Sequence, residues 1–261
     1  MTRLRIGCSG WSYKDWRGPF YPQTLAQKDW LSFYATRFDT TEINASFYRL
    51  PSEAAVANWA ARAPVGFAWS WKASRYITHN KKLKDCGDSI ALVFERMAPL
   101  GDEGCVLFQL PPMLRRDDAR LADFVALLPK GRRCAFEFRH SSWYDATVFD
   151  ILAQARMALC ISDHHAAPSP WEATAPYVYV RGHGPGGRYR DRYPAQTLED
   201  WARRLEALRD EGREVFCYFD NDIKSAAPMD AALLLDWLGD KAAPPPAPDA
   251  NHRSHNRRKP L

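Results

Sequence analysis

Eight short apolar runs recur along the chain, and most of them are followed by a stretch with helical periodicity. The runs lie at residues 5–9, 41–47, 68–73, 105–110, 135–139, 158–163, 177–181 and 214–219. A regular alternation of strand and helix is typical of parallel α/β folds, and eight such units predict a single TIM-type (β/α)8 barrel. An open doubly wound sheet is the alternative. It would ordinarily carry a G-x-G-x-x-G turn after an early strand, and no such turn occurs there.

The barrel is expected to occupy residues 1–240, because a chain of 261 residues is long enough for one such domain. Residues 241–261 hold three consecutive prolines and several basic side chains, and they are predicted to form a disordered tail. The net charge is +5, and residues 242–261, with four basic side chains against one Asp, supply +3 of it. The remaining +2 leaves a nearly balanced body, which does not support nucleic-acid binding.

No apolar run approaches the length of a membrane-spanning helix, and the N-terminus leads directly into the first predicted strand without a signal peptide. We therefore expect a cytoplasmic protein that does not attach to a membrane. The six cysteines include no C-x-x-C pair, and most fall inside predicted strands. Buried free thiols are predicted rather than disulfides or a zinc site. The sequence leaves the oligomeric state open.

The fifth predicted strand carries full charges on one of its faces. Side chains alternate along a strand, so Glu137 and Arg139 share a face, roughly 7 Å apart along the chain. Phe136 and Phe138 then point the other way, towards an apolar layer. Such a strand fits a sheet closed on itself, with helices outside and polar groups inside near one end.

Polar side chains gather where the predicted strands end, which is where barrel enzymes build their active sites. A core would favour apolar residues at these positions. Each group also has a structural alternative: Gln109 can bond to the backbone, and His140 can cap the helix that follows. The polar groups at the strand ends are Ser9, Glu42, Asn44, Lys72, Gln109, Glu137, Arg139, His140, Asp163, Arg181, His183, Asp220 and Asn221.

Two chemistries fit these groups. In the first, a glutamate acts as general acid or base, and the lysine and two arginines hold an anionic group such as phosphate or carboxylate. The catalytic candidates are Glu137, Glu42 and His140. The candidates for substrate binding are Asn44, Lys72, Gln109, Arg139, Arg181, His183, Trp11 and Asn221.

In the second chemistry, carboxylates and histidines bind divalent metals for hydrolysis. The cations Lys72, Arg139 and Arg181 count against it because they would repel a metal, and no H-E-x-x-H motif is present. Beside two glutamates, three cations leave the mouth close to charge balance and slightly positive. A divalent ion would make it strongly cationic unless Asp163 and Asp220 also entered it. We therefore predict no metal and no cofactor.

Six motifs occur in order along the chain, and together they resemble domain-of-unknown-function family 72, also called the YecE-like family. The resemblance covers residues from about Arg5 to Leu238 and implies a TIM-type barrel. It implies no reaction, since the activity of the family is not established. The family commonly has Phe-Asn-Asn at the eighth strand, where this chain has Phe-Asp-Asn, so no amide role is carried over to Asp220. The motifs are G-W-S-Y (10–13) with F-Y-P (20–22), E-I-N (42–44) with F-Y-R-L-P (47–51), K-A-S-R (72–75) with T-H (78–79), F-Q-L-P-P (108–112), F-E-F-R-H (136–140) with S-W (142–143), and V-R-G-H-G (180–184).

The sequence thus favours an enzyme whose barrel mouth acts on a polar, anionic substrate, such as a phosphoester or a nucleotide-like molecule. Hydrolysis and lyase chemistry are the reaction classes that we expect. Two alternatives stay open: a protein that binds a ligand or nucleic acid without turnover, and a metal-dependent phosphoesterase.

Overall fold

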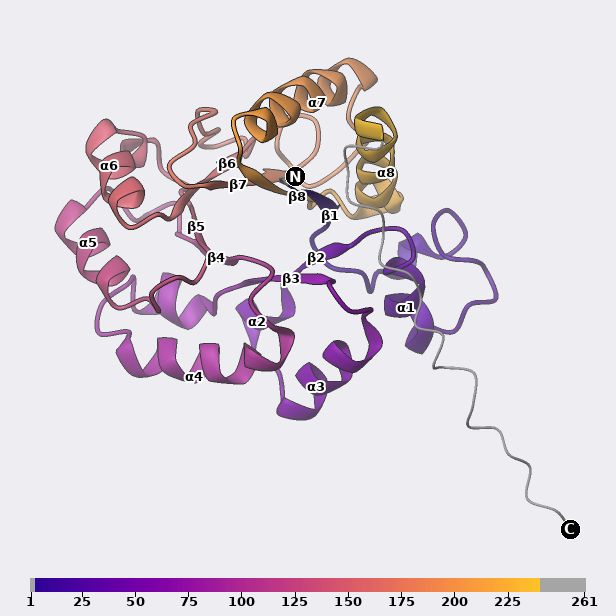
Figure 1. The fold of residues 1–261 in the computed structure, drawn as a ribbon, viewed down its shortest axis with the longest axis horizontal. Coiled ribbons are helices and arrows are strands. Elements are labelled where there is room, and N and C mark those ends of the chain that lie inside the picture. The colour runs from indigo at the N-terminus through magenta and orange to yellow at the C-terminus, as the bar shows by residue number, and fades with distance from the viewer. Residues whose placement is uncertain (1–2, 240–261) are drawn as a thin grey trace, which may run out of the picture.

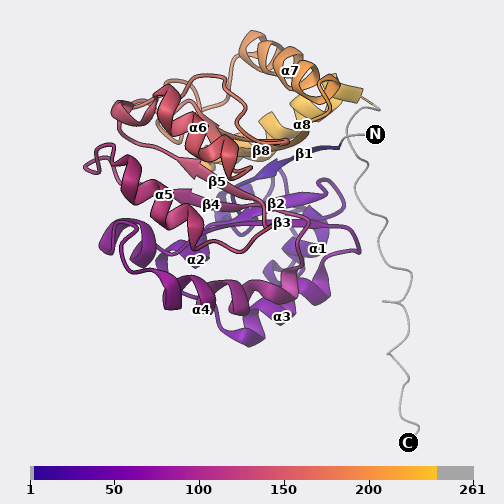
Figure 2. The same cartoon turned by 60° about the vertical axis from the view of Figure 1, so that its left-hand side comes forward.

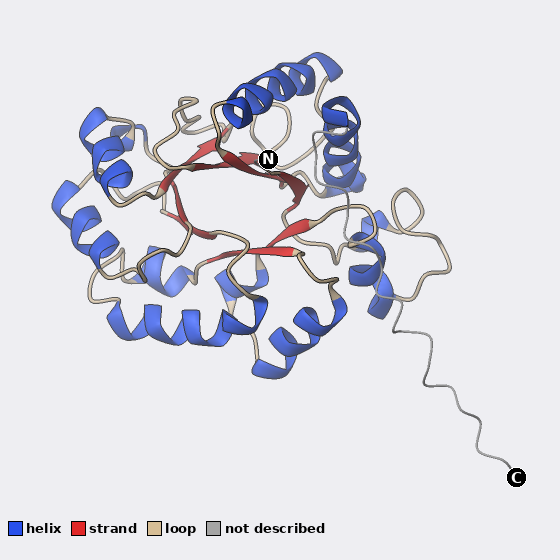
Figure 3. Ribbon diagram, in the orientation of Figure 1, coloured by secondary structure: helices blue, strands red, loops and turns tan. Residues whose placement is uncertain are grey.

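A ring of eight parallel strands surrounded by helices makes up residues 3–239, the part of the chain that the computed structural model describes (Figure 1, Figure 3). The predicted TIM-type (β/α)8 barrel is therefore confirmed, while the predicted tail at 241–261 lies outside the described residues. In the sheet the strands follow the order β1-β8-β7-β6-β5-β4-β3-β2. Their bounds are β1 (Leu4–Cys8), β2 (Thr40–Ile43), β3 (Ala68–Lys72), β4 (Val106–Gln109), β5 (Cys134–Glu137), β6 (Ala158–Ser162), β7 (Tyr177–Gly182) and β8 (Glu214–Phe219).

Helices form the outer layer, with α7 and α8 on one side of the ring and α3 and α4 on the opposite side (Figure 2). Several begin at a side-chain cap: Ser52 accepts from the Ala55 N–H at the start of α3 (Glu53–Arg62), and Asp117 and Asp145 cap α5 (Asp118–Ala126) and α6 (Ala146–Gln154) with their carboxylates. Within the described chain, β6 and β7 are joined without an α-helix. The helices are α1 (Trp30–Tyr34), α2 (Ala45–Tyr48), α3 (Glu53–Arg62), α4 (Gly87–Met97), α5 (Asp118–Ala126), α6 (Ala146–Gln154), α7 (Ala195–Asp210) and α8 (Ala226–Leu238).

Side-chain alternation along the strands divides the core into an outer and an inner layer. The rings of Phe136 and Phe138 point outward as predicted, and Phe138 stacks on Trp143 with the ring centres 4.9 Å apart. The inner layer fills the barrel with small side chains and a few large rings. Its members are Ala68, Cys105, Leu107, Ala135, Ala158, Cys160, Ala175, Tyr177, Tyr179, Phe216 and Tyr218. All six cysteines are buried free thiols, as predicted.

Side chains, rather than a backbone ladder, join β1 to β2, which are the two ends of the strand order. The Tyr34 hydroxyl accepts from the Cys8 N–H at 2.7 Å and donates to the Thr40 carbonyl at 3.0 Å. Thr41 Oγ1 donates to the Cys8 carbonyl at 3.0 Å. Gly7 is required at this joint because a Cβ there would lie 2.3 Å from the Thr40 carbonyl oxygen. We call this joint the β1–β2 seam.

The second strand is shorter than residues 41–47, so that part of the strand prediction is wrong. β2 ends at Ile43, Asn44 has helical dihedral angles, and α2 begins at the next residue. Ser46 Oγ donates to the Lys72 carbonyl at 2.7 Å, which fixes this short helix over the end of β3. Of the polar residues at 42, 44 and 46, only Glu42 therefore lies in the strand. Asn44 and Ser46 lie at the start of the helix that follows it. No helix among residues 3–239 is long and apolar enough to cross a membrane.

Candidate functional site at the mouth of the barrel

Arg181, near the end of β7, lies at the centre of a buried ion cluster at the carboxyl-end mouth of the barrel. Its Nη1 donates to Glu137 at 2.9 Å, and its Nη2 donates to Glu42 at 2.9 Å and to Asp220 at 2.7 Å. The two glutamates come from β5 and β2, and the aspartate follows β8 directly. One fully buried arginine therefore connects four strands.

Glu137, at the end of β5, is held by a second arginine. Arg139 Nη2 donates to Glu137 Oε1 at 2.6 Å, and Ser162 Oγ donates to the same oxygen at 3.1 Å. With Arg181 on Oε2, both carboxylate oxygens are engaged. Arg139 is only 5% exposed, and its Nε and Nη1 have no hydrogen-bond partner within residues 3–239. Two buried donor groups of this side chain are thus available to an acceptor.

Glu42, the second buried glutamate, accepts hydrogen bonds from neutral groups as well. The Tyr179 hydroxyl donates to Oε2 at 2.5 Å, and Ser9 Oγ donates to Oε1. Asn44 Nδ2 in turn donates to Ser9 Oγ at 2.5 Å. The predicted site residues Glu42 and Asn44 therefore lie together at the end of β2.

His183, fully buried after β7, orients the two arginines. Its Nε2 lies 3.1 Å from Arg181 Nη1 and 3.2 Å from Arg139 Nη2. A guanidinium only donates, so we assign Nε2 as an acceptor and place the ring proton on Nδ1, which faces Asp163 Oδ1 at 3.2 Å. Burial lowers the pKa of His183, which favours this neutral form. Tyr193 fixes the other oxygen of Asp163.

Lys72 ends β3, and its ammonium lies 4.3 Å from the centre of the Phe47 ring in α2. No carboxylate within the described chain forms an ion pair with it. Burial, and next the charge of Arg181, lower the pKa of Lys72 to about 8. His79 packs its ring on Phe47 at 5.1 Å, and burial, followed by the charge of Lys72, lowers its pKa to about 4. Lys72 is thus a cation that can lose its proton close to neutral pH.

The two glutamates are ionised at neutral pH. Burial alone would raise the pKa of Glu137, but the charges of Arg139 and Arg181 hold it well below its usual range. Arg181, with the Ser9 and Tyr179 hydroxyls, likewise outweighs burial and lowers the pKa of Glu42. Such carboxylates are weak bases, and they anchor the arginines.

The expected charge of the mouth is wrong. Asp220 binds Arg181 at 2.7 Å and Asp163 lies 3.2 Å from His183, so four carboxylates, rather than two, accompany the three cations. The alternation of the eighth strand carried a signal for Asp220, because this residue shares a face with Tyr218, which points into the barrel. Even so, no group of three or more His, Cys, Asp or Glu within residues 3–239 could hold a metal ion.

The side chains of two predicted site residues bond to backbone groups close to them in the sequence. Gln109, at the end of β4, donates from Nε2 to the Leu110 carbonyl at 2.8 Å. His140 Nδ1 accepts from the Ser142 N–H at 3.1 Å and caps the short helix that begins there. Both side chains have the structural role that was the alternative to function.

Two more predicted residues point away from the ion cluster. Asn221 donates to Asp230 of α8 at 2.9 Å, because it lies on the opposite face of the chain from its neighbour Asp220. Trp11 packs edge-on against Trp59 and Trp69, each with ring centres 5.7 Å apart, in the outer layer. Neither side chain contacts the arginines in the structure.

A small cavity of about 360 Å³ opens beside the ion cluster. Tyr189, which no periodic signal in its glycine-rich loop indicated, faces the Arg139 guanidinium at 5.9 Å and His183 at 4.8 Å. Burial and the charge of Asp220 raise the pKa of Asp222, which favours a protonated carboxyl there. The lining residues are Tyr13, Lys14, Asp15, Tyr189, Asp220, Asp222 and Ile223.

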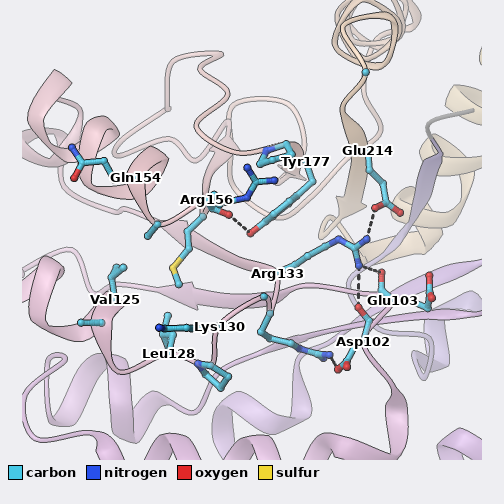
Figure 4. Close-up of a pocket in the computed structure, with 18 residues that line it drawn as sticks. Asp102, Glu103, Val125, Leu128, Lys130, Arg133, Gln154, Arg156, Tyr177 and Glu214 are labelled. Atoms are coloured by element: carbon cyan, nitrogen blue, oxygen red, sulfur yellow. Dashed lines mark hydrogen bonds and ion pairs between the residues drawn. The ribbon is translucent and has the colours of Figure 1, made fainter.

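A larger cavity of about 920 Å³ lies at the opposite end of the barrel, where the strands begin (Figure 4). Its polar groups are largely paired with one another. Arg133 donates to Glu214 at 2.8 Å and to the Asp102 carbonyl at 3.0 Å, and the Tyr177 hydroxyl donates to the Arg156 carbonyl at 3.2 Å. These contacts join the starts of β5, β7 and β8, so they serve to close the lower end of the barrel.

Fold and site together define a TIM-type barrel protein with an arginine–carboxylate cluster at the mouth formed by the strand ends. The chain belongs to the family described as "Protein of unknown function DUF72", which matches residues 5–252 and agrees with the motifs of the sequence.

Relatives of this chain bear no established activity in their names. It is 26% identical over 269 residues to the UPF0759 protein YunF of Bacillus subtilis, covering 90% of this chain and 94% of that protein. It is 28% identical over 143 residues to the UPF0759 protein YecE of Escherichia coli K12, covering 54% and 50%. The crystal structure of a DUF72 family protein from Thermotoga maritima superposes with a TM-score of 0.82 at 24% identity, covering 90% and 99%. One from Enterococcus faecalis gives 0.77 at 21%, covering 90% and 95%. Both structures support the fold.

Proposed function

We propose that this protein is an enzyme whose barrel mouth binds a polar substrate carrying a phosphate or carboxylate group and performs hydrolysis or lyase chemistry on it. The observation that carries the proposal is the two unpaired donors of Arg139, whose Nε and Nη1 are buried without a hydrogen-bond partner in the described chain. Buried donors of a charged group are strongly stabilised by an acceptor, and each of these two groups can donate to an oxygen of a phosphate or carboxylate.

The distribution of unpaired groups favours an anion over a cation. Glu137 and Asp220 already accept from arginines, and Glu42 also accepts from hydroxyls. The unpaired charged donors of the cluster belong to Arg139 and to Arg181 Nε. Both Nη groups of Arg181 donate to carboxylates. We therefore assign Arg181 the role of holding the ion cluster together and not that of binding the ligand.

Lys72 supplies the second positive charge and the proton-transfer group of the proposal. Its pKa of about 8 lies near neutral pH, where a general base or acid works best. The glutamates that were expected in this role are engaged by arginines and are weak bases. We therefore assign proton transfer to Lys72 and anchoring to Glu137 and Glu42.

The test is thermal melting with inorganic phosphate or sulfate. Both anions should raise the Tm of the wild-type protein, because a ligand that binds only the folded state stabilises it. Arg139→Lys keeps the charge beside Glu137 but removes the unpaired Nε and Nη1 donors, so it should fold and lose most of this rise. EDTA should change little. A rise in Tm with micromolar zinc or manganese that EDTA reverses, and none with phosphate, would instead support the metal-dependent phosphoesterase.

Turnover separates the enzyme from a protein that only binds its ligand. Lys72→Arg keeps the positive charge but has no accessible pKa near neutral pH. In a panel of phosphoesters, it should keep phosphate-induced stabilisation and lose turnover. Turnover that survives this substitution would refute the role of Lys72, and binding without any turnover would favour the non-catalytic alternative.

A further inference from the structure

Four cations and two tyrosines lie exposed on the loops that follow β2 and β3, at the rim of the same mouth. In the described chain, none of the four cations has a carboxylate within ion-pair distance. We call this group the rim patch, and its members are Tyr48, Arg49, Arg75, Tyr76, Lys82 and Lys84.

Arginines elsewhere on the surface are commonly neutralised by carboxylates. Arg116, for example, binds Asp118 at 2.6 Å and Asp145 at 2.7 Å, and Arg203 pairs with two acidic side chains of α7. The loop at 73–86 instead carries four basic side chains against one aspartate. A nearly balanced total charge therefore conceals a strongly positive rim, which suits a ligand with several negative charges.

The tyrosines of the rim patch expose aromatic faces. Tyr48 is 72% exposed and Tyr76 is 51% exposed, and the ammonium of Lys81 lies 5.6 Å from the centre of the Tyr76 ring. Aromatic rings interleaved with cations bind single-stranded nucleic acid, because each unpaired base has a face that stacks and each phosphate has a charge. A segment that binds a lipid surface inserts apolar side chains such as Leu and Phe, whereas the rings of the rim patch carry polar hydroxyls.

The rim patch is continuous with the candidate site. Phe47 contacts Tyr48 edge-on at 5.0 Å and His79 at 5.1 Å, and the Lys72 ammonium lies over the same ring. A chain of contacts thus leads from the exposed tyrosine to the amine in the mouth. Lys72 and Tyr48 therefore both contact Phe47, which places the rim patch next to the mouth.

The loop after β3 holds its shape through unusual backbone conformations. Tyr76–Asn80 form a π-helical turn, and Lys82, Leu83 and Asp85 have φ angles of 50°, 71° and 50°. Left-handed conformations at residues other than glycine are costly, and they persist where the surrounding structure fixes them. Leu83 is 3% exposed and anchors the loop in the core. The loop that carries the flanking cations Lys82 and Lys84 therefore has a fixed conformation.

We infer that the rim patch binds single-stranded nucleic acid, with bases stacked on Tyr48 and Tyr76 and phosphates against the four cations. One phosphate of the strand enters the mouth, so the substrate class of the proposed enzyme is an oligonucleotide. This assignment rests on the proposed function, since it uses the same anion site at Arg139.

The test is fluorescence anisotropy with a labelled oligothymidylate of about twelve nucleotides, measured from about 50 to 200 mM NaCl. Arg49→Glu/Arg75→Glu should raise Kd at least about tenfold and flatten its salt dependence, because phosphate contacts are lost. The charge-matched control is Lys130→Glu/Arg156→Glu, two exposed cations at the opposite end of the barrel, which should change Kd less than about twofold. Tyr48→Ala/Tyr76→Ala should weaken binding about tenfold or more through lost stacking.

Equal weakening by rim and control variants would overturn the inference, because it would indicate non-specific attraction. Binding to phosphatidylserine vesicles but not to the oligonucleotide would also overturn it. The rim variants should keep phosphate-induced stabilisation, and Arg139→Lys should lose it. If phosphate stabilises the protein but the oligonucleotide does not bind, only this inference is refuted. If the oligonucleotide binds at the rim but phosphate does not stabilise the protein, the proposed function is refuted.

Discussion

Arg139 and Arg181 have the same side chain and share the same carboxylate, yet their environments give them different roles. Arg181 is fully buried and donates from both Nη groups to three carboxylates, whereas Arg139 keeps Nε and Nη1 unpaired in the described chain. The alternation of the strands was enough to predict that both face the mouth. It could not predict which one has both Nη groups paired, because that depends on Asp220, which only barrel closure brings into range.

Removal of Arg181 should destabilise the protein more than removal of an exposed arginine. Arg181→Met leaves Glu42, Glu137 and Asp220 buried without their common partner, and breaking such a cluster costs about 3–5 kcal/mol. The measurement is the free energy of unfolding in urea at pH 7. Arg203→Met, which removes an exposed pair on α7, is the control and should cost much less. Equal losses would show that the buried cluster does not contribute beyond a surface pair.

The cost of Arg181→Met should also depend on pH. The folded-state pKa of Glu137 lies below its unfolded value, so its stabilisation is present above the unfolded pKa and is lost as the pH falls through the folded one. Without Arg181, burial of these carboxylates is less well compensated, so their pKa values should rise and they can take up protons as the pH falls from 7 towards 4. The destabilisation should therefore be largest at pH 7 and shrink on acidification. A constant difference between pH 7 and 4 would contradict this account.

Lys72 should react with amine reagents at a lower pH than an ordinary lysine. Its pKa of about 8 means that the Lys72 amine is neutral in half of the molecules at that pH, and only the neutral amine is nucleophilic. Competitive acylation read by peptide mass spectrometry should give a midpoint near 8 for this site. Phosphate should protect it if the anion binds beside it. A labelling rate at Lys72 that still climbs at pH 10 would contradict the prediction.

At the scale of the elements, the β1–β2 seam depends on one hydroxyl of α1. The helical spacing of Trp30, Phe33, Tyr34 and Phe38 predicts an apolar stripe, and these rings do pack in the outer layer. No pattern in the sequence shows that the Tyr34 hydroxyl bonds to backbone groups of both strands, since this requires the strands to meet. Periodicity therefore predicted which face of the helix is buried but not its polar contact.

Tyr34→Phe should weaken the seam while keeping its packing. The Cys8 N–H and the Thr40 carbonyl would lose their shared partner, and leaving buried polar groups unpaired costs about 1–3 kcal/mol. Hydrogen exchange of the Cys8 amide should accelerate, which separates a local effect from general destabilisation. Tyr21→Phe, a buried tyrosine whose hydroxyl donates to the Trp11 carbonyl at 2.5 Å, is the matched control. Unchanged exchange at Cys8 in the first variant would rule out this role.

For the whole molecule, the number and order of the strands followed from the sequence, because each parallel strand is a local apolar run of nearly fixed length. The distribution of charge over the surface did not follow. A total of +2 for the body hides a basic rim, since the loops after β2 and β3 are adjacent only in the folded ring. Local patterns therefore gave the architecture, and contacts between distant segments gave the site.

The β1–β2 seam makes the ring of strands mechanically uneven. Around most of its circumference a backbone ladder fixes the spacing of the strands, but here the joint consists of side-chain bonds. Arg181 binds Glu42 on one side of the β1–β2 seam and Asp220 on the other, so its ion pairs connect the strands across the seam. The ion pairs that a ligand would meet at the mouth therefore also hold this joint together.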